Sequence, residues 1–325
     1  MLSTVAYVVF PCLLGFVLVR KYRERTWSWC KNNASLEGKI VLITGANSGI
    51  GYETAKELAR RQAHIIFACR NIDRAEEAMA KIRNSISNCK EMVAMQVDLS
   101  DLSNIRNFAS EINKKYPKID ILINNAGVYL PLELNKVTKD GFEIHFGVNH
   151  LGHFLLTNLL IDNLKRAAPS RVVIVSSLLH ESGKIDLDDL NLEILKKNLK
   201  KSRMNPGYSK SKLENAYFGR ELATRLKGSG VDVHTVCPGF THTGLFRDVV
   251  KWYHYILFAP VAFLFMRTAK QGAQTVIWCA TEPTLIGESG NFYRNCAKYK
   301  SKVNFNSQLQ TSLWDISSKL VGLKS

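Results

Sequence analysis

The sequence lacks the cysteine patterns that hold small domains together. Its seven cysteines are odd in number and scattered, and no two of them form a C-x-x-C pair. None stands at a ligand-like spacing from a histidine. Neither a disulfide framework nor a structural zinc site is therefore expected. The same pattern favours a reducing compartment.

Internal repeats, low-complexity linkers and a visible break between domains are also absent. Hydrophobic residues make up 46% of the 325 positions, which is enough to bury a sizeable core. A disordered chain would be poorer in such residues. We therefore expect one folded domain, and we place it at residues 38–325.

Acidic residues are scarce beside basic ones, 28 against 44, and the formal net charge is +16. Such an excess is typical of proteins that neutralise phosphates. The basic residues are nevertheless spread along the chain, except in "RKYRER" (20–25) and "KKNLKKSR" (196–203), and no nucleic-acid-binding module is present. We expect no nucleic-acid partner, which leaves an anionic membrane surface or a solvated face.

Charged side chains are missing altogether from Leu2 to Val19. As a helix this stretch would be about 27 Å long, close to the thickness of the hydrocarbon core. A cleaved signal peptide is the alternative, but no basic residue precedes the apolar run and no clear small-x-small site follows it. We predict a membrane anchor at 1–20 and a basic juxtamembrane linker at 21–37. The linker's charge predicts a cytosolic domain, in which the sequon at Asn33 would stay unglycosylated.

Beyond residue 38, short runs rich in Val and Ile alternate with stretches of helical periodicity. The runs show no polar alternation, as is typical of strands buried on both faces. The alternation predicts a single doubly wound parallel sheet (Rossmann fold), with helices on both faces and right-handed crossovers. The expected strands are 39–44, 64–69, 91–98, 119–124, 171–176 and 231–237.

Two segments interrupt this rhythm, and both are candidate substrate loops. Residues 181–206 are polar and loop-like, with a short helix expected near "LEILKKNLKK". The second loop, 244–268, contains the apolar run 252–266, which is shorter than a membrane span and includes Pro260. That run fits a buried helix pair as well as it fits an apolar substrate lid or a membrane-dipping patch.

The run "TGANSGIG" (44–51) follows the first expected strand and precedes an amphipathic helix. Small residues let the backbone turn tightly and approach a pyrophosphate, whose charge is met by the amides and positive end of the next helix. The glycine spacing, G-x-x-x-G-x-G, differs from the general dinucleotide fingerprint. The candidate cofactor residues here are Gly45, Asn47, Ser48, Gly49, Ile50 and Gly51.

An NAD site usually presents an acidic residue after the second strand, but none occurs here before Asp73. Arg70 instead offers a guanidinium suited to a 2′-phosphate, so NADP(H) is the expected cofactor. Asp98 closes the third strand and could accept from the adenine amino group or cap a turn. Asn71 and Leu99 complete this part of the candidate site.

The fourth strand ends in "NNAG", where Asn125, Ala126 and Gly127 would leave room for a cofactor. Histidines follow at positions 145, 150 and 153. No acidic ligand or supporting partner is evident near them, so structural or solvent-facing histidines are expected and no metal site is predicted.

On a helix, residues four apart share a face, so Lys212 can act beside Tyr208 whereas Lys210 points away and is expected to be solvated. Seven motifs, which follow one another along the chain in the order expected for the family, resemble those of the short-chain dehydrogenases/reductases over about residues 38–293. They are "TGANSGIG", "VDLS", "NNAG", "VNHLGHF", "SS", "YSKSK" and "CPGFTHT". "ACRN", the N-terminal anchor and "SGNFY" look most like the membrane-associated retinol dehydrogenase branch.

The resemblance implies a catalytic tetrad of Asn149, Ser177, Tyr208 and Lys212. Tyr208 would give a proton to a carbonyl oxygen that Ser177 also hydrogen-bonds. Lys212, together with the positive charge of oxidised nicotinamide, would lower the pKa of Tyr208 and hold the nicotinamide ribose. Asn149 would hold a water that replenishes the proton. The loop after the sixth strand would surround the carboxamide end of the nicotinamide with Pro238, Gly239, Thr241 and Thr243.

Ser177 and Tyr208 are 31 positions apart, which is longer than the resemblance implies and leaves the substrate open. We expect a membrane-anchored oxidoreductase that uses NADP(H) on an apolar alcohol/carbonyl pair, first of all retinol/retinal. The alternatives are steroid or lipid-derived carbonyls and a non-catalytic, nucleotide-binding membrane scaffold. The resemblance suggests the endoplasmic reticulum membrane, with mitochondria or lipid droplets as alternatives, and it leaves room for a homodimer.

Overall fold

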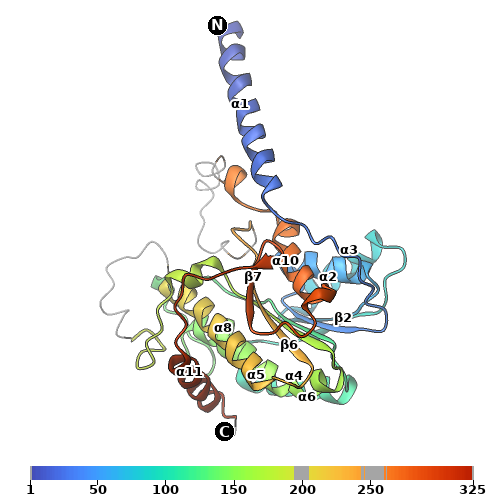
Figure 1. The fold of residues 1–325 in the computed structure, drawn as a ribbon, viewed down its shortest axis with the longest axis vertical. Coiled ribbons are helices and arrows are strands. Elements are labelled where there is room, and N and C mark those ends of the chain that lie inside the picture. The colour runs from blue at the N-terminus through green and yellow to red at the C-terminus, as the bar shows by residue number, and fades with distance from the viewer. Residues whose placement is uncertain (1, 194–204, 243–244, 246–259, 261, 324–325) are drawn as a thin grey trace.

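The core of the protein is an eight-stranded sheet in the order β3-β2-β1-β4-β5-β6-β7-β8 (Figure 1). The computed structural model describes residues 2–193, 205–242, 245, 260 and 262–323, with the backbone alone at 2–9, 12, 13 and 132. Strands β1 to β7 are parallel, and β8 pairs antiparallel with β7. The parallel sheet predicted from the sequence is confirmed.

All six predicted strands are present, with bounds within a few residues of those expected. The two strands at the β8 edge were not predicted, because β7 and β8 are too short to show a pattern. The strands are β1 (Ile40–Thr44), β2 (His64–Cys69), β3 (Met92–Gln96), β4 (Ile121–Asn124), β5 (Ser170–Val175), β6 (Val231–Cys237), β7 (Asn291–Arg294) and β8 (Ala297–Lys298).

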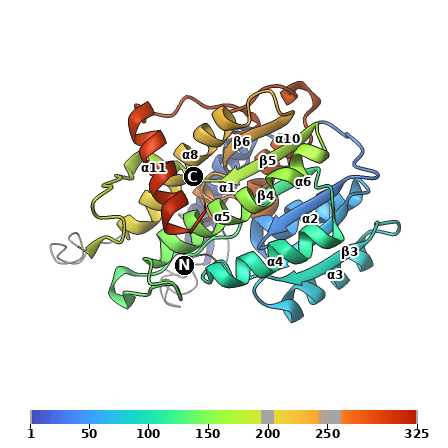
Figure 2. The ribbon, with the colours of Figure 1, turned by 90° about the horizontal axis from the view of Figure 1, so that it is seen from below.

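Helices cover both faces of the sheet (Figure 2). Helices α4 (Leu102–Lys115), α5 (Gly152–Leu159) and α8 (Pro206–Arg225) lie on one face, and α11 (Ser307–Leu320) packs outside α8. Helices α2 (Gly49–Arg60), α3 (Ile72–Ser85) and α10 (Ala269–Thr281) lie on the other. The remaining helical elements are η1 (Leu132–Leu134), η2 (Phe146–Leu151), α6 (Ile161–Arg166), η3 (Leu178–Ser182) and η5 (Pro283–Leu285).

Strand β1 shows why continuous apolar runs predict this architecture. Successive side chains of a strand point to opposite faces. Leu42 accordingly belongs to the core under α4, α5 and α8, whereas Val41 and Ile43 belong to the core under α2, α3 and α10. All three side chains are fully buried. A strand with helices on both sides therefore favours apolar residues on both of its faces.

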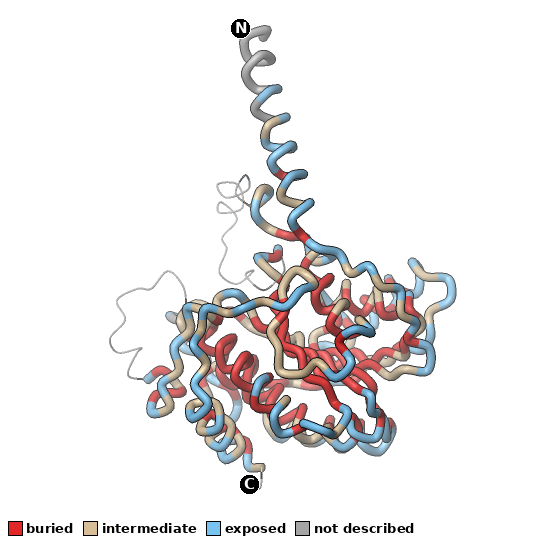
Figure 3. Tube along the Cα trace, in the orientation of Figure 1, coloured by how far each residue is buried: buried red, intermediate tan, exposed pale blue. Residues whose placement is uncertain are grey.

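The N-terminal helix α1 (Leu2–Arg25) projects away from this domain (Figure 1). Large apolar side chains along it are exposed, among them Phe10, Leu14 and Leu18. Figure 3 shows exposed residues along much of the described part of the helix. Within the ranges that the structure describes, no helix has both the length and the apolarity required to cross a membrane.

The two interrupting segments are described only in part. Residues 183–192 are irregular, as expected, and the short helix expected near "LEILKKNLKK" falls almost entirely outside the described residues. Of the apolar run 252–266, residues 260 and 262–265 are helical. The choice between a buried helix pair, a lid and a membrane-dipping patch rests on residues that are not described.

Candidate active site

The turn between β1 and α2 has the geometry expected of an anion-binding loop. Gly45 and Gly49 have positive φ angles of 67° and 56°, which favour glycine. A Cβ atom on Gly51 would lie 2.3 Å from the Gly45 carbonyl oxygen. Ser48 precedes the helix without a side-chain hydrogen bond to it, so the first amides of α2 remain for a ligand. These features fit a pyrophosphate.

The residues that follow β4 are hydrogen-bonded to this turn. Asn125 Nδ2 donates to the carbonyl oxygens of Thr44 (2.9 Å) and Gly45 (3.3 Å). The Thr44 hydroxyl accepts from the amides of Asn125 (2.9 Å) and Ala126 (3.0 Å). The Cβ position of Gly51 is also only 2.6 Å from Asn125 Nδ2. The "NNAG" stretch and the glycine turn are therefore held together. They lie side by side because each follows one of the neighbouring strands β1 and β4.

The residues predicted to bind the adenosine end of the cofactor make contacts close to themselves in the chain. Arg70 is exposed at the end of β2, and its guanidinium has no ion-pair partner among the described residues. Asn71 Oδ1 caps α3 by accepting from the Arg74 amide at 2.8 Å. Asp98 Oδ1 accepts from the Ser100 amide (2.9 Å) and hydroxyl (2.7 Å). Asp98 thus caps a turn, as its alternative interpretation predicted, and Leu99 is buried beside it.

Tyr208, Lys212 and Ser177 come together at the carboxyl end of β5. Helix α8 carries Tyr208 and Lys212, and Ser177 follows the strand. Lys212 Nζ donates to the Val175 carbonyl oxygen at 3.0 Å and lies 5.6 Å from the centre of the Tyr208 ring. The side chains of Tyr208 and Ser177 are hydrogen-bonded. The one-turn spacing on α8 therefore brings the phenol and the amine to the same place.

Burial controls the ionisation of Tyr208 and Lys212. It raises the pKa of Tyr208 well above 10, and the hydrogen bond with Ser177 opposes this only partly. Burial also lowers the pKa of Lys212 from 10.5 to about 8. The expectation that Lys212 lowers the pKa of Tyr208 is not met in the protein alone, because loss of hydration outweighs the other effects. At neutral pH the phenol is protonated and the amine still carries most of its charge.

Asn149 lies in the π-helix η2, where its side chain holds the segment after β4. Its Oδ1 accepts from the Val128 amide at 2.8 Å. Its Nδ2 donates to the Val128 carbonyl oxygen (3.1 Å) and to the Ser211 hydroxyl (3.0 Å). Both amide hydrogens are therefore used within the protein. The side chain therefore positions backbone, and the expectation that Asn149 holds a water of a proton relay stays a prediction.

The loop after β6 is shaped around a buried arginine. Gly239 has a φ of 84°, and a Cβ atom there would lie 2.8 Å from Arg267 Nε. The Pro238 carbonyl oxygen accepts from Arg267 Nη1 at 3.1 Å. Thr241 is buried and donates to the Gly239 carbonyl oxygen at 3.2 Å. Thr243, also predicted to bind cofactor, lies outside the described residues.

Comparison with known proteins assigns the fold and this site to a family. The family model described as short chain dehydrogenase matches residues 39–186. Retinol dehydrogenase 14 from Homo sapiens is 42% identical over 302 residues, which cover 89% of this chain and 88% of the relative. The chain belongs to the short-chain dehydrogenase family. It is therefore an oxidoreductase, and the resemblance noted in the sequence is confirmed.

Solved structures agree with the short-chain dehydrogenase fold. An uncharacterized protein from Mycobacterium paratuberculosis has a TM-score of 0.68 and 32% identity, over 92% of this chain and 98% of that one. The complex of RhlG from Pseudomonas aeruginosa with NADP has a TM-score of 0.63 and 22% identity, over 79% of this chain and 94% of that one. The second likeness concerns the fold alone.

The environment of Lys210 in this short-chain dehydrogenase differs from the solvated one that we predicted. It is only 2% exposed, so the prediction of a solvated lysine was wrong. Its Nζ lies 2.7 Å from Glu214 Oε1, donates to the Leu190 carbonyl oxygen at 2.7 Å and sits 4.4 Å from the centre of the Phe146 ring. The reason is that neighbouring elements bury most of α8 all round, so the face away from Tyr208 is also interior.

The three histidines are buried and contact protein groups, which agrees with a structural role. One of them has an acidic partner that sequence reasoning missed. His145 Nδ1 donates to Glu143 Oε1 at 2.6 Å, and Nε2 accepts from the Leu130 amide at 3.0 Å. The His145 ring lies edge-on to Tyr208 at 6.2 Å. The E-x-H spacing in "GFEIHF" is the signal that could have revealed this pair.

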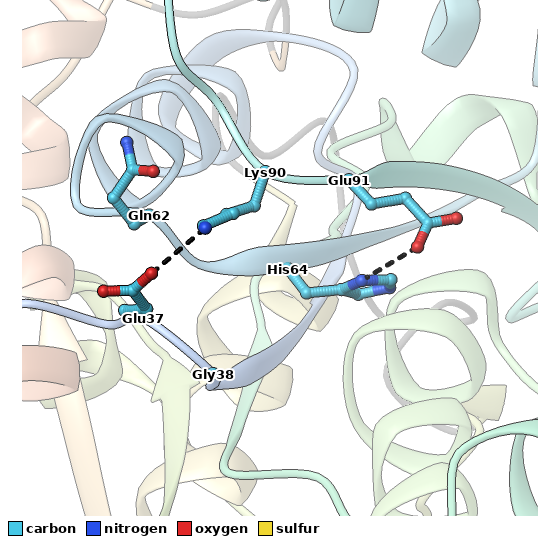
Figure 4. Close-up of a pocket in the computed structure, with 6 residues that line it drawn as sticks. All are labelled: Glu37, Gly38, Gln62, His64, Lys90 and Glu91. Atoms are coloured by element: carbon cyan, nitrogen blue, oxygen red, sulfur yellow. Dashed lines mark ion pairs between the residues drawn. The ribbon is translucent and has the colours of Figure 1, made fainter.

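No group of three or more potential metal ligands occurs in the described part of the chain. A charged surface hollow lies instead at the amino ends of the strands, lined by Glu37, Gly38, Gln62, His64, Lys90 and Glu91 (Figure 4). Glu37 pairs with Lys90 at 3.0 Å and His64 with Glu91 at 3.3 Å. Tyr208 and the glycine turn lie at the carboxyl ends, so this hollow is not part of the candidate active site.

Proposed function

We propose that this enzyme is a membrane-anchored NADP(H)-dependent oxidoreductase acting on an apolar alcohol/carbonyl pair, with retinal and retinol as the first choice. The observation that carries the proposal is the convergence of Tyr208, Ser177 and Lys212 at the carboxyl end of β5, next to Gly127. The relative named retinol dehydrogenase 14 supports the substrate class.

The residues present suit a nicotinamide dinucleotide. The first amides of α2 would hold the pyrophosphate, and the compact Gly51 would let it approach. The free guanidinium of Arg70 would meet a 2′-phosphate, because no carboxylate stands there to bind a ribose hydroxyl. Residues 125–127 and 238–241 would border the nicotinamide end, and Asp98 would remain available to the adenine through its second carboxylate oxygen.

When bound, the reduced cofactor supplies a hydride to the carbonyl carbon. Tyr208 would donate its phenolic proton to the carbonyl oxygen at the same time, which produces the alcohol. Because burial raises its pKa, Tyr208 holds that proton at neutral pH. The Ser177 hydroxyl would donate to the same oxygen as negative charge develops there. The Lys212 ammonium would stabilise the phenolate left behind, and Asn149 would keep the segment after β4 in position.

Apolar surface around the candidate site supports an apolar substrate and a membrane location. Phe240 follows β6 and is 57% exposed, while Phe263 and Phe265 are 48% and 45% exposed. Phe263 and Phe265 contact the last turns of α1, where Arg20 Nη1 donates to the Phe263 carbonyl oxygen and the Arg23 guanidinium carbon lies 4.3 Å from the centre of the Phe265 ring. We propose that α1 inserts in the endoplasmic reticulum membrane, with the domain in the cytosol, so that a substrate dissolved in the bilayer can reach Tyr208.

The test is turnover of retinal, a steroid ketone and a lipid aldehyde by the purified full-length protein, with NADPH and with NADH. Retinal with NADPH should give the highest kcat/KM. Tyr208→Phe should still bind NADPH and should lose at least about 100-fold in kcat. Preference for the steroid or the aldehyde would reassign the substrate, and cofactor binding without turnover of any carbonyl would favour the scaffold alternative.

A further inference from the structure

Arg267 is a buried cation that organises the loop after β6. It is 4% exposed, and no carboxylate pairs with it among the described residues. Its guanidinium donates to the Pro238 carbonyl oxygen (3.1 Å) and to Asn295 Oδ1 (2.5 Å). Its backbone amide donates to the Phe240 carbonyl oxygen at 2.7 Å, and its own carbonyl oxygen accepts from the His242 amide at 2.8 Å. Both its side chain and its backbone therefore hold residues 238–242, which we call the cofactor loop.

The partner that faces the Arg267 charge comes from the other end of the chain. The buried Trp27 ring, just beyond α1, lies 5.3 Å from the Arg267 guanidinium carbon. The Arg20 guanidinium carbon, on the last turns of α1, lies 4.6 Å from the same ring. Stacking a guanidinium on an indole face is an attractive contact that strengthens when water is excluded. Trp27 therefore links a residue of α1 to the residue that holds the cofactor loop.

Arg20 makes a second connection to the same place. Its Nη1 donates to the carbonyl oxygens of Phe263 and Met266, both at 2.6 Å. These carbonyls close the short helix that runs directly into Arg267. Glu24, also on α1, pairs with Arg20 Nε at 2.8 Å and keeps the guanidinium in place. The base of α1 thus contacts both the segment leading to Arg267 and the ring beside it.

We propose that Arg267 is a positioning residue for the cofactor loop and that Arg20 and Trp27 couple it to α1. The N-terminal helix would then act as part of the scaffold for the nicotinamide end of the cofactor as well as a tether. This inference rests on the proposed cofactor site. It concerns only the nicotinamide end, because the glycine turn and Arg70 are held by other contacts.

The test compares two ligands that differ only at that end. NADPH and 2′-phospho-ADP-ribose share the adenosine, 2′-phosphate and pyrophosphate, and only NADPH has the nicotinamide. In full-length protein held in detergent micelles, Trp27→Ala should raise the Kd for NADPH about tenfold, which corresponds to about 1.4 kcal/mol. The Kd for 2′-phospho-ADP-ribose should be unchanged. Trp27→Phe, which keeps an aromatic face, should recover most of the NADPH affinity.

Matched controls separate this effect from general damage. Trp29→Ala removes an exposed indole two residues away, and Lys21→Ala removes an exposed positive charge next to Arg20. Arg20→Ala should weaken NADPH about fivefold or more, and neither control should do so. Equal weakening of both ligands by Trp27→Ala, or no change for either, overturns the inference. Wild-type protein that binds neither ligand would instead overturn the proposed cofactor.

Hydrogen exchange gives a readout that needs no cofactor. The amides of His242 and Arg267 are bonded within the loop. Their exchange should be about tenfold faster in Trp27→Ala than in Trp27→Phe or wild type, while the amides of β1 should exchange as before. Unchanged protection at His242 and Arg267 would contradict the coupling, even if NADPH affinity fell.

Discussion

Lys212 shows how one buried side chain links stability to pH. Burial lowers its pKa from 10.5 to about 8, because an ammonium loses hydration inside the protein. Below pH 8 both folded and unfolded forms are protonated, and the folded state bears the full cost of the buried charge. Between pH 8 and 10.5 the unfolded state binds more protons, so this cost fades as the pH rises.

Replacing Lys212 by Met should therefore increase the free energy of unfolding most at pH 7. The advantage over wild type should shrink by about 3 kcal/mol as the pH rises from 8 to 10.5. Urea unfolding of the cofactor-free protein at several pH values measures this difference. A difference that stays constant over this range would show that the pKa of Lys212 is not lowered by folding.

Arg70 should decide between the two nicotinamide cofactors. Its free guanidinium can pair with a 2′-phosphate, and such a charge-assisted contact contributes about 1 to 3 kcal/mol. Arg70→Ala should thus weaken NADPH about 5- to 150-fold and leave NADH nearly unchanged. Fluorescence titration with both cofactors measures this, with the exposed Lys81→Ala as control. Equal losses for the two cofactors would remove Arg70 from cofactor choice.

Among the elements, α8 carries the candidate chemistry on one face and a buried ion pair on the other. The Lys210 and Glu214 side chains are 2% and 0% exposed. Burial raises the pKa of Glu214, and Lys210 opposes this. Removing one partner of such a pair leaves an uncompensated buried charge, which is far more destabilising than removing both.

Lys210→Met should accordingly lower the free energy of unfolding by about 3 to 5 kcal/mol. The double variant Lys210→Met/Glu214→Leu should recover most of that loss. Arg60→Ala breaks an exposed pair with Glu57 on α2 and should cost less than about 1 kcal/mol. If Lys210→Met cost no more than Arg60→Ala in denaturant unfolding, the buried pair would not be formed.

At the scale of the whole molecule, the proposal that α1 anchors the enzyme in a membrane can be tested directly. Its exposed apolar side chains would be covered by lipid in the proposed orientation. The full-length protein should sediment with membranes, resist extraction by alkaline carbonate and dissolve in detergent. Leu14→Arg/Leu18→Arg should release it, because each arginine near the centre of a bilayer costs about 2.5 to 3.5 kcal/mol. Tyr22→Arg, beyond the apolar run, should stay bound, and glycosylation at the exposed Asn33 would contradict a cytosolic domain.

The sequence by itself determined the features that depend on neighbours along the chain. Apolar runs predicted the parallel strands, because such runs are typical of strands buried on both faces. The spacing of Tyr208 and Lys212 predicted their shared face on α8, because helical geometry is local. The glycines of the first turn could be recognised for the same reason.

Only the tertiary structure decided what depends on contacts between distant segments. The burial of Lys210, with its contact to Leu190, follows from neighbours far along the chain, as does the packing of Trp27 against Arg267 across 240 positions. Likewise, the balance that raises the pKa of Tyr208 depends on how much water the folded protein excludes. The burial of such polar side chains is a property of the assembled fold, and the sequence around them does not indicate it.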